Sequence, residues 1–252
     1  MENKEEQKRY SRRNFLKNSG LTIGGLAVGA GIGSQFRKTK EVEVTKEVPV
    51  EKIVENNANR ALMYFSPQQF RIAEAAAERI FPEDELGPGA KKLNVAYFID
   101  HQLASSWGTR GREYTMGPFF KGEATQGYQG HLNRQQIFDI GLQGLHDYSQ
   151  KTFQKPFEQL TAEEQDQVLI AFEQDQVELK GISASSFFAQ LRTVTIEGVY
   201  ADPMYGGNNQ MEAWKMKNYP GHQMTYAQII DSEEFQVIKP QSLNSQHQNH
   251  QH

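Results

Sequence analysis

Four histidines in the central part of the chain are the side chains best suited to hold a metal ion: His101, His131, His146 and His222. Neutral imidazole is a frequent zinc ligand, and a hydrolytic zinc centre needs about three protein ligands around one open position. None of these histidines forms an HExxH sequence or another closely spaced ligand pair. A metal site therefore depends on the fold bringing them together, and structural or surface roles are the alternative.

The other patterns that could carry chemistry are explained better by local structure. No Gly-x-Ser-x-Gly elbow marks a nucleophilic serine, and the serines near residue 183 fit helix capping. The acidic run at residues 83–85 lies between proline and glycine, as in a solvated turn. The glycines at 29, 31 and 33 lack the preceding strand of a dinucleotide-binding turn. Because the chain has no cysteine, disulfides, iron–sulfur ligation and cysteine-linked haem are excluded within it. We therefore expect no cofactor site in this chain.

A pair of arginines near the N-terminus indicates an export signal. Arg12 and Arg13 precede Phe15 and Leu16, and an uncharged stretch follows from residue 18 to residue 36. This order is typical of a twin-arginine signal. The twin-arginine translocase recognises such a signal and exports proteins that have already folded. We expect an extracytoplasmic location, in the periplasm or on the outer face of the cytoplasmic membrane. The apolar core at residues 21–32 is shorter than the roughly 20 residues of a comfortable membrane span. Cleavage and retention as a membrane contact both stay open.

Charge divides the chain into two parts. Residues 1–40 contain nine Lys and Arg and three Asp and Glu, a net charge of +6, whereas the remainder has a net charge of −10. A basic patch is the electrostatic footprint of most nucleic-acid-binding proteins. The acidic main part therefore argues against nucleic acid as a partner.

The elements that must position these side chains are predicted to be helices. We expect an all-α fold, an irregular helical bundle with long loops rich in glycine and aromatic residues. A signal segment at residues 1–36 and a charged linker at 37–65 precede it, and Pro49 argues against a continuous helix in the linker. The helical domain is predicted to cover residues 66–240. A Gln- and His-rich tail at 241–252 is expected to be disordered.

Helical periodicity and capping signals place the individual helices. Ser66-Pro67 begins the first, which stops at Pro82, and Thr161 with Glu164 forms a capping box at the start of the fourth. A long loop at residues 107–130 separates the second helix from the third, and its aromatic residues argue against disorder. The expected helices run over residues 66–81, 90–105, 133–153, 161–177, 183–200 and 225–235.

Aromatic residues gather in that loop and in a second irregular segment after residue 200. Tyr and Trp are enriched at binding hot spots, and Asp-Pro and Gly-Gly sequences favour tight turns and close backbone approach. The alternative is that the second segment covers the domain's own core. The candidate partner interface consists of Trp107, Phe119, Phe120, Tyr128, Tyr200, Asp202, Tyr205, Gly206, Gly207, Asn208 and Trp214.

Several of these stretches resemble one known family. The segment Asp-Pro-Met-Tyr-Gly-Gly-Asn at residues 202–208, continued to residue 221, is the most specific of them. Arg-Ile-Phe-Pro at 79–82, Gly-Pro-Phe-Phe at 117–120 and Gly-Tyr-Gln at 127–129 are individually weaker. Together with the twin-arginine start, they are similar to the gluconate 2-dehydrogenase subunit 3 family, over roughly residues 66–222.

The resemblance implies a role within a complex. In this family the small subunit has no known redox centre, while a large subunit carries FAD and performs the oxidation. A cytochrome c subunit, where present, supplies haem c. The small subunit would escort the flavin-loaded large subunit through export, which suits a pathway for folded proteins. The resemblance supplies no catalytic residues. It leaves gluconate, 2-ketogluconate, sorbitol and fructose open as substrates.

Two other functions stay open from the residues alone. One is an independent exported enzyme whose metal site is built from the four histidines and nearby carboxylates. The other is an envelope protein that holds a small ligand with the aromatic loop at residues 107–130.

Overall fold

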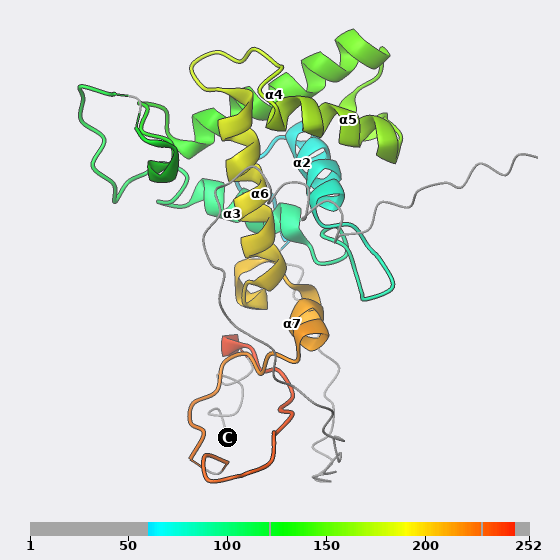
Figure 1. Ribbon diagram of the computed structural model, residues 1–252, viewed down its shortest axis with the longest axis vertical. Helices are drawn as coiled ribbons and strands as arrows, with labels where there is room; N and C mark the ends of the chain where they lie inside the picture. Colours follow the sequence, from blue (N-terminus) through cyan, green and yellow to red (C-terminus); the bar gives the residue numbers. More distant parts are fainter. Residues whose placement is uncertain (1–59, 121, 228, 245–252) are drawn as a thin grey trace, which may run out of the picture.

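The computed structural model describes residues 60–120, 122–227 and 229–244, and the predicted all-α class is confirmed there. Figure 1 shows the helices packed around α6, with the loop at residues 107–130 extending to one side. In these residues β structure is limited to two isolated bridges. The predicted signal, with Arg12, Arg13, Phe15 and Leu16, lies outside the described residues. The helices are α2 (Pro67–Ile80), α3 (Val95–Ala104), α4 (Arg134–Phe153), α5 (Ala162–Glu173), α6 (Ala184–Tyr200) and α7 (Glu212–Lys217), with short 3-10 turns η2 (Ala124–Gln126), η3 (Phe157–Gln159), η4 (Pro203–Tyr205) and η5 (Asn209–Met211).

Side-chain caps explain where four of the helices begin. Ser66, Asn133 and Thr161 each accept a hydrogen bond from the backbone of the third helical residue, whose own Gln or Glu side chain bonds back to the cap. Ser183 accepts a hydrogen bond from the backbone of Ser186 at the start of α6. These contacts satisfy backbone N–H groups that a helix start leaves unpaired. The predicted starts of α2, α4, α5 and α6 are thereby confirmed.

Three phenylalanines form the centre of the core. Phe138 of α4 and Phe172 of α5 both meet the ring of Phe187 of α6, with centroids 5.6 and 6.0 Å apart and near-perpendicular planes. Such edge-to-face packing is the preferred geometry of aromatic pairs. Gly141 makes room for it, because a Cβ there would stand 2.1 Å from the Phe187 ring. The bundle is therefore organised around α6.

The Arg-Ile-Phe-Pro stretch at residues 79–82 joins α2 to its neighbours. Arg79 donates two hydrogen bonds to the Asp166 carboxylate of α5, at 2.8 and 2.7 Å. This pairing raises the pKa of Arg79 against the opposing effect of burial. Ile80 and Phe81 are buried, and the Phe81 ring meets the edge of Tyr200 at 6.2 Å. The stretch therefore supports the bundle.

Two predicted helices are shorter than expected. The second begins at Val95 rather than at residue 90, because Asn94 has a φ of 59°, a left-handed conformation that breaks the helix there. The fourth ends at Glu173 rather than at residue 177, since Asp175 has a φ of 57°. The Asp175 carboxylate instead accepts a hydrogen bond from the backbone of Ser185, at the start of α6. A tertiary contact thus competes with continuation of the helix.

The predicted helix at residues 225–235 is wrong. The described residues of this stretch form turns, and Ile230 and Phe235 are exposed. The short helix α7 forms upstream instead, where Ala213 and Trp214 are buried. Most helical stability in proteins comes from packing of an apolar face, and only the upstream stretch has a core to pack on. Among the described residues, no helix combines the length and apolar character needed to cross a membrane.

Both ends of the predicted domain extend further than expected. The buried Asp100 carboxylate of α3 accepts the backbone N–H groups of residues 63–65, so this part of the predicted linker packs on the bundle. His101 adds a contact of 2.9 Å between its Nε2 and the carbonyl oxygen of Ala61. At the other end, Ser242 is buried and belongs to the domain rather than to the predicted disordered tail.

Candidate partner-binding surface

The two ends of the aromatic loop, residues 107–130, are joined by Arg110. Its Nη1 donates to the carbonyl oxygens of Gly130 at 3.0 Å and Leu132 at 3.3 Å, and its Nε donates to Glu113 at 2.8 Å. Backbone carbonyls on the far side of the loop are thus bonded by a side chain from its near side. The loop is long, but its base is closed.

Arg134, the first residue of α4, fixes the same base to the bundle. Its guanidinium lies over the Trp107 ring, 4.7 Å from the centroid, and donates to the Trp107 carbonyl oxygen at 3.0 Å and to the Glu113 carboxylate. The Trp107 ring also meets the edge of Phe138 in the core, at 6.5 Å. A cation over an aromatic face adds attraction to the hydrogen bonds. The base of the loop is therefore continuous with the core.

Glu113 is the acidic partner shared by the two arginines. Partial burial raises the pKa of the Glu113 carboxyl, but hydrogen bonds from Arg134 and Arg110 outweigh it, so the pKa lies below its ordinary value. The carboxylate is thus charged at neutral pH, which suits a bridge between two guanidinium groups.

The tip of the loop presents large apolar side chains to solvent. Residues 111–120 are all exposed, and the exposed fractions of their four large apolar side chains range from 44% to 82%. Phe119 and Phe120, two of the candidate interface residues, are among them. Tyr114 and Met116 were not included in the predicted interface. Their position in the same Gly-rich stretch could have indicated that they are exposed as well. Phe119 contacts His131, with ring centroids 6.0 Å apart. An apolar cluster on a fixed base is typical of a docking surface.

Trp107 and Tyr128, also predicted as interface residues, belong to the base of the loop. Both are half-buried and pack against the core. The Tyr128 hydroxyl oxygen accepts the backbone N–H of Leu132 at 3.2 Å. They hold the loop in place on the bundle.

The second predicted segment, residues 200–214, mostly covers the domain's own core. Asn208 is fully buried in a left-handed conformation, with a φ of 45°. Its Nδ2 donates to the Ala201 carbonyl at 2.9 Å, and its Oδ1 accepts the Ala213 N–H at 3.0 Å. This amide therefore ties the end of α6 to α7.

The two glycines before it allow the chain to approach α6. Gly206 has a φ of 103°, which favours glycine. A Cβ on Gly207 would stand 2.1 Å from the backbone oxygen of Gly198 in α6. Both glycines are buried. They serve packing rather than contact with a partner.

Trp214, another of the predicted interface residues, packs inside the domain. Its side chain is 5% exposed, its Nε1 donates to the Tyr200 carbonyl oxygen at 2.8 Å, and its ring meets Tyr219 at 5.4 Å. Tyr200 is half-buried against the core. Tyr205, 48% exposed, is the predicted residue of this segment that presents a large side chain to solvent.

Asp202 is occupied by the chain's own residues. Its Oδ1 accepts the backbone N–H of Met204 at 3.0 Å and the Ser242 hydroxyl at 2.6 Å, and its Oδ2 accepts the backbone N–H of Leu243 at 2.9 Å. The Asp-Pro turn was predicted from the sequence. The hydrogen bonds from residues 242 and 243 to Asp202 were not, because these residues lie about 40 positions further along the chain.

The four histidines do not form a metal centre in the described residues, where no group of three or more His, Cys, Asp or Glu side chains is placed to hold a metal ion. His101 contacts Ala61, and His146 lies 3.4 Å from the Gln68 side-chain amide. His131 stacks near Phe119. Each of these three has a structural contact instead.

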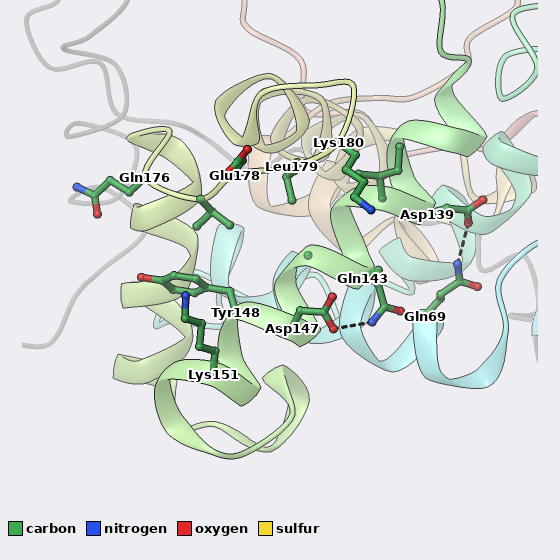
Figure 2. A pocket seen from close by; sticks show the side chains of 13 residues that line it. Gln69, Asp139, Gln143, Asp147, Tyr148, Lys151, Gln176, Glu178, Leu179 and Lys180 are labelled. Atoms are coloured by element: carbon green, nitrogen blue, oxygen red, sulfur yellow. Dashed lines mark hydrogen bonds between the residues drawn. The ribbon is translucent and has the colours of Figure 1, made fainter.

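An open groove of about 850 Å³, lined by both charged and apolar side chains, lies between α4 and residues 176–180 (Figure 2). Two of its carboxylates already accept hydrogen bonds: Asp147 accepts from Gln143 at 2.7 Å, and Asp139 accepts from Gln69 at 2.8 Å. The Tyr64 hydroxyl also donates to Asp139, which with burial raises the pKa of Tyr64. No motif predicted this groove, because its walls come from segments that are distant in sequence.

Comparison with known proteins gives one result. The family model described as Gluconate 2-dehydrogenase subunit 3 matches residues 67–221, which is more than half of the chain. The chain therefore belongs to the gluconate 2-dehydrogenase subunit 3 family, and the predicted resemblance is confirmed. No match was found among curated proteins or among solved structures.

Proposed function

We propose that this member of the gluconate 2-dehydrogenase subunit 3 family is the non-catalytic small subunit of an exported, FAD-dependent dehydrogenase complex. Membership suggests a subunit of a gluconate 2-dehydrogenase complex, so a partner subunit is expected. The chain binds, stabilises and escorts the large subunit that carries FAD. Where a third subunit with haem c is present, that subunit transfers the electrons. This chain has no cysteine to which haem c could be attached.

The exposed tip of the aromatic loop is the observation that carries this proposal. Phe119 and Phe120 lie within the family-matched region and expose large apolar surfaces, while Arg110 and Arg134 hold the loop beneath them. Exposed aromatic side chains on a preorganised base lose little conformational freedom when they bind. The tip therefore suits a protein partner.

The twin-arginine sequence supports the escort role. Arg12 and Arg13 would direct the chain to the twin-arginine translocase, which accepts folded cargo. A large subunit that must load its flavin before export could travel bound to this chain. The complex would then work on the outer side of the cytoplasmic membrane, with the N-terminal segment as its membrane contact.

Isolation of the full chain from its native cell tests the proposal. We expect the wild-type chain to copurify with a larger subunit whose absorbance spectrum shows flavin and which oxidises a sugar or sugar acid. Phe119→Ser combined with Phe120→Ser should lower the recovered flavin at least tenfold. Leu86→Ser is the matched control, since Leu86 is also an exposed apolar loop residue.

The folding of each variant is checked by circular dichroism, because exposed positions should leave the helices intact. A colourless single chain from wild-type cells would contradict the proposal. Full flavin recovery with the double variant would leave the proposed complex standing but would place the partner contact outside the tip of the aromatic loop.

A further inference from the structure

A second projecting segment, residues 222–240, forms what we call the C-terminal arm. It begins just after residue 221, where the family match ends. Figure 1 shows it at the opposite end of the molecule from α4, beyond α7, in orange to red. No part of the family comparison therefore assigns it a role.

The base of the arm is closed by backbone and side-chain hydrogen bonds. The N–H of His222 donates to Gln241 at 2.8 Å, and the N–H of Gln241 donates to Pro220 at 3.1 Å. Asp202 accepts from Ser242 and Leu243 immediately beyond it. Both ends of the arm are thus fixed to the family domain.

Between its ends the arm bonds mainly to itself. The N–H groups of Ile229 and Ile230 donate to Tyr226, and Gln236 donates to Ser232 and Glu234. Every hydrogen bond given for the described residues among 224–239 joins two residues of the arm. The arm therefore stands away from the bundle.

The arm exposes five large apolar side chains, with exposed fractions from 46% to 81%. Single exposed apolar residues are ordinary on protein surfaces, whereas a concentration of them in one segment marks an interaction site. The five are Met224, Tyr226, Ile230, Phe235 and Val237. They are the counterpart, on another part of the molecule, of the apolar tip of the aromatic loop.

We propose that the C-terminal arm is a second docking element for the flavin-bearing large subunit, and this inference rests on the proposed function. The arm carries Asp231, Glu233 and Glu234 against Lys239, a net charge of −2. Its apolar side chains would enter an apolar groove of the partner, and its carboxylates would face a basic rim. Its negative charge disfavours an anionic lipid surface as the occupant.

Two separate contacts on one chain have a direct consequence for affinity. Once the aromatic loop has bound, the arm meets the partner at a high effective concentration, so loss of either contact weakens the complex by much more than its share of surface. The arm's closed base limits the entropy lost on docking.

The test uses the full chain purified with its flavin-bearing partner. Ile230→Ser combined with Phe235→Ser should increase the dissociation rate of the complex at least tenfold, measured as loss of bound flavin during gel filtration at rising dilution. Ile170→Ser is the matched control, because Ile170 is an exposed isoleucine on α5. Replacing Asp231, Glu233 and Glu234 by lysine should weaken the complex as well, with the loss growing as salt is lowered.

The outcomes separate this inference from the proposed function. If the wild-type chain brings down no flavin subunit, the proposed function fails. A second outcome is that the wild type binds the flavin subunit, the Phe119 and Phe120 variant loses it, and the arm variant retains it at full affinity. That outcome overturns only the arm proposal. Binding to vesicles of phosphatidylglycerol and phosphatidylcholine that depends on Ile230 and Phe235, with the complex unaffected, would assign the arm to the membrane instead. Loss of self-association alone in the arm variant would assign it to a second copy of this chain.

Discussion

The carboxylate of Asp100, fully buried in α3, accepts the backbone N–H of Phe65 at 2.6 Å. The same carboxylate also accepts the N–H groups of Met63 and Tyr64. One side chain thereby fixes the point where the N-terminal part of the chain joins the bundle.

Replacing Asp100 by asparagine should destabilise the domain by about 3 kcal/mol, because the amide nitrogen that takes the place of one carboxylate oxygen would face a buried backbone N–H that then lacks an acceptor. Thermal unfolding measures the change. Asp147→Asn on the exposed surface of α4 serves as the control and should alter stability by no more than about 0.5 kcal/mol. Equal stability of the Asp100 variant and wild type would mean that this attachment does not contribute to folding.

Trp214 and Tyr205 should separate folding from binding. Trp214→Ala removes a buried ring and its hydrogen bond to Tyr200, so we expect a loss of about 3–5 kcal/mol in unfolding free energy. Tyr205→Ala removes a half-exposed side chain and should change stability by less than about 1 kcal/mol. Denaturant titration of the two variants gives the comparison. A stable Trp214 variant would return this residue to the candidate interface.

Gly207→Ala should be strongly destabilising, because the added Cβ would collide with the backbone oxygen of Gly198. Backbone atoms cannot move aside as a flexible side chain can, so the cost should reach about 3 kcal/mol, the upper end of overpacking effects. Gly111→Ala, whose nearest atom would be 3.4 Å away, is the control. Equal melting temperatures for the two variants would contradict the close contact between α6 and the segment after it.

Glu113 should make the base of the aromatic loop sensitive to acid. Its folded-state pKa is lowered, so its stabilising contribution is present above the unfolded value of about 4.3 and is lost as pH falls through the lowered value. Glu113→Gln should therefore speed hydrogen exchange in residues 108–132 at pH 7. The difference from wild type should shrink towards pH 3.

The matched control for Glu113 is Glu85→Gln, in an exposed loop away from this base. It should leave exchange in the aromatic loop unchanged. A difference between the Glu113 variant and wild type that stays constant from pH 7 to pH 3 would show that the carboxylate charge is not what holds the loop.

Under the proposed escort role, Arg12→Lys combined with Arg13→Lys should stop export of this chain and of the proposed flavin-bearing subunit together, because one signal would serve both. Cell fractionation followed by detection of each subunit checks this. Lys38→Arg, a change that keeps charge outside the paired arginines, is the control. Continued export of the large subunit in the double variant would contradict the escort role.

Local signals in the sequence were sufficient for the fold class and for most helix starts. Ser66, Thr161 and Ser183 each satisfy backbone donors within three residues, so a short window contains the whole interaction. Helix ends and the short helix α7 were harder to predict from the sequence. Asp175 and Asn208 act through partners on other segments, and a pattern read along the chain does not show them.

The candidate interface was determined in part by sequence and in part by tertiary structure. Aromatic residues in a long Gly-rich loop made Phe119 and Phe120 interface candidates from composition alone, and the structure shows both side chains exposed. Similar composition after residue 200 also made Trp214 and Tyr205 interface candidates, yet Trp214 is buried and Tyr205 is exposed. Burial depends on what the rest of the chain brings to each side chain. Only the packing of residues 201–214 against α6 could decide which of these aromatic residues are exposed and which support the core.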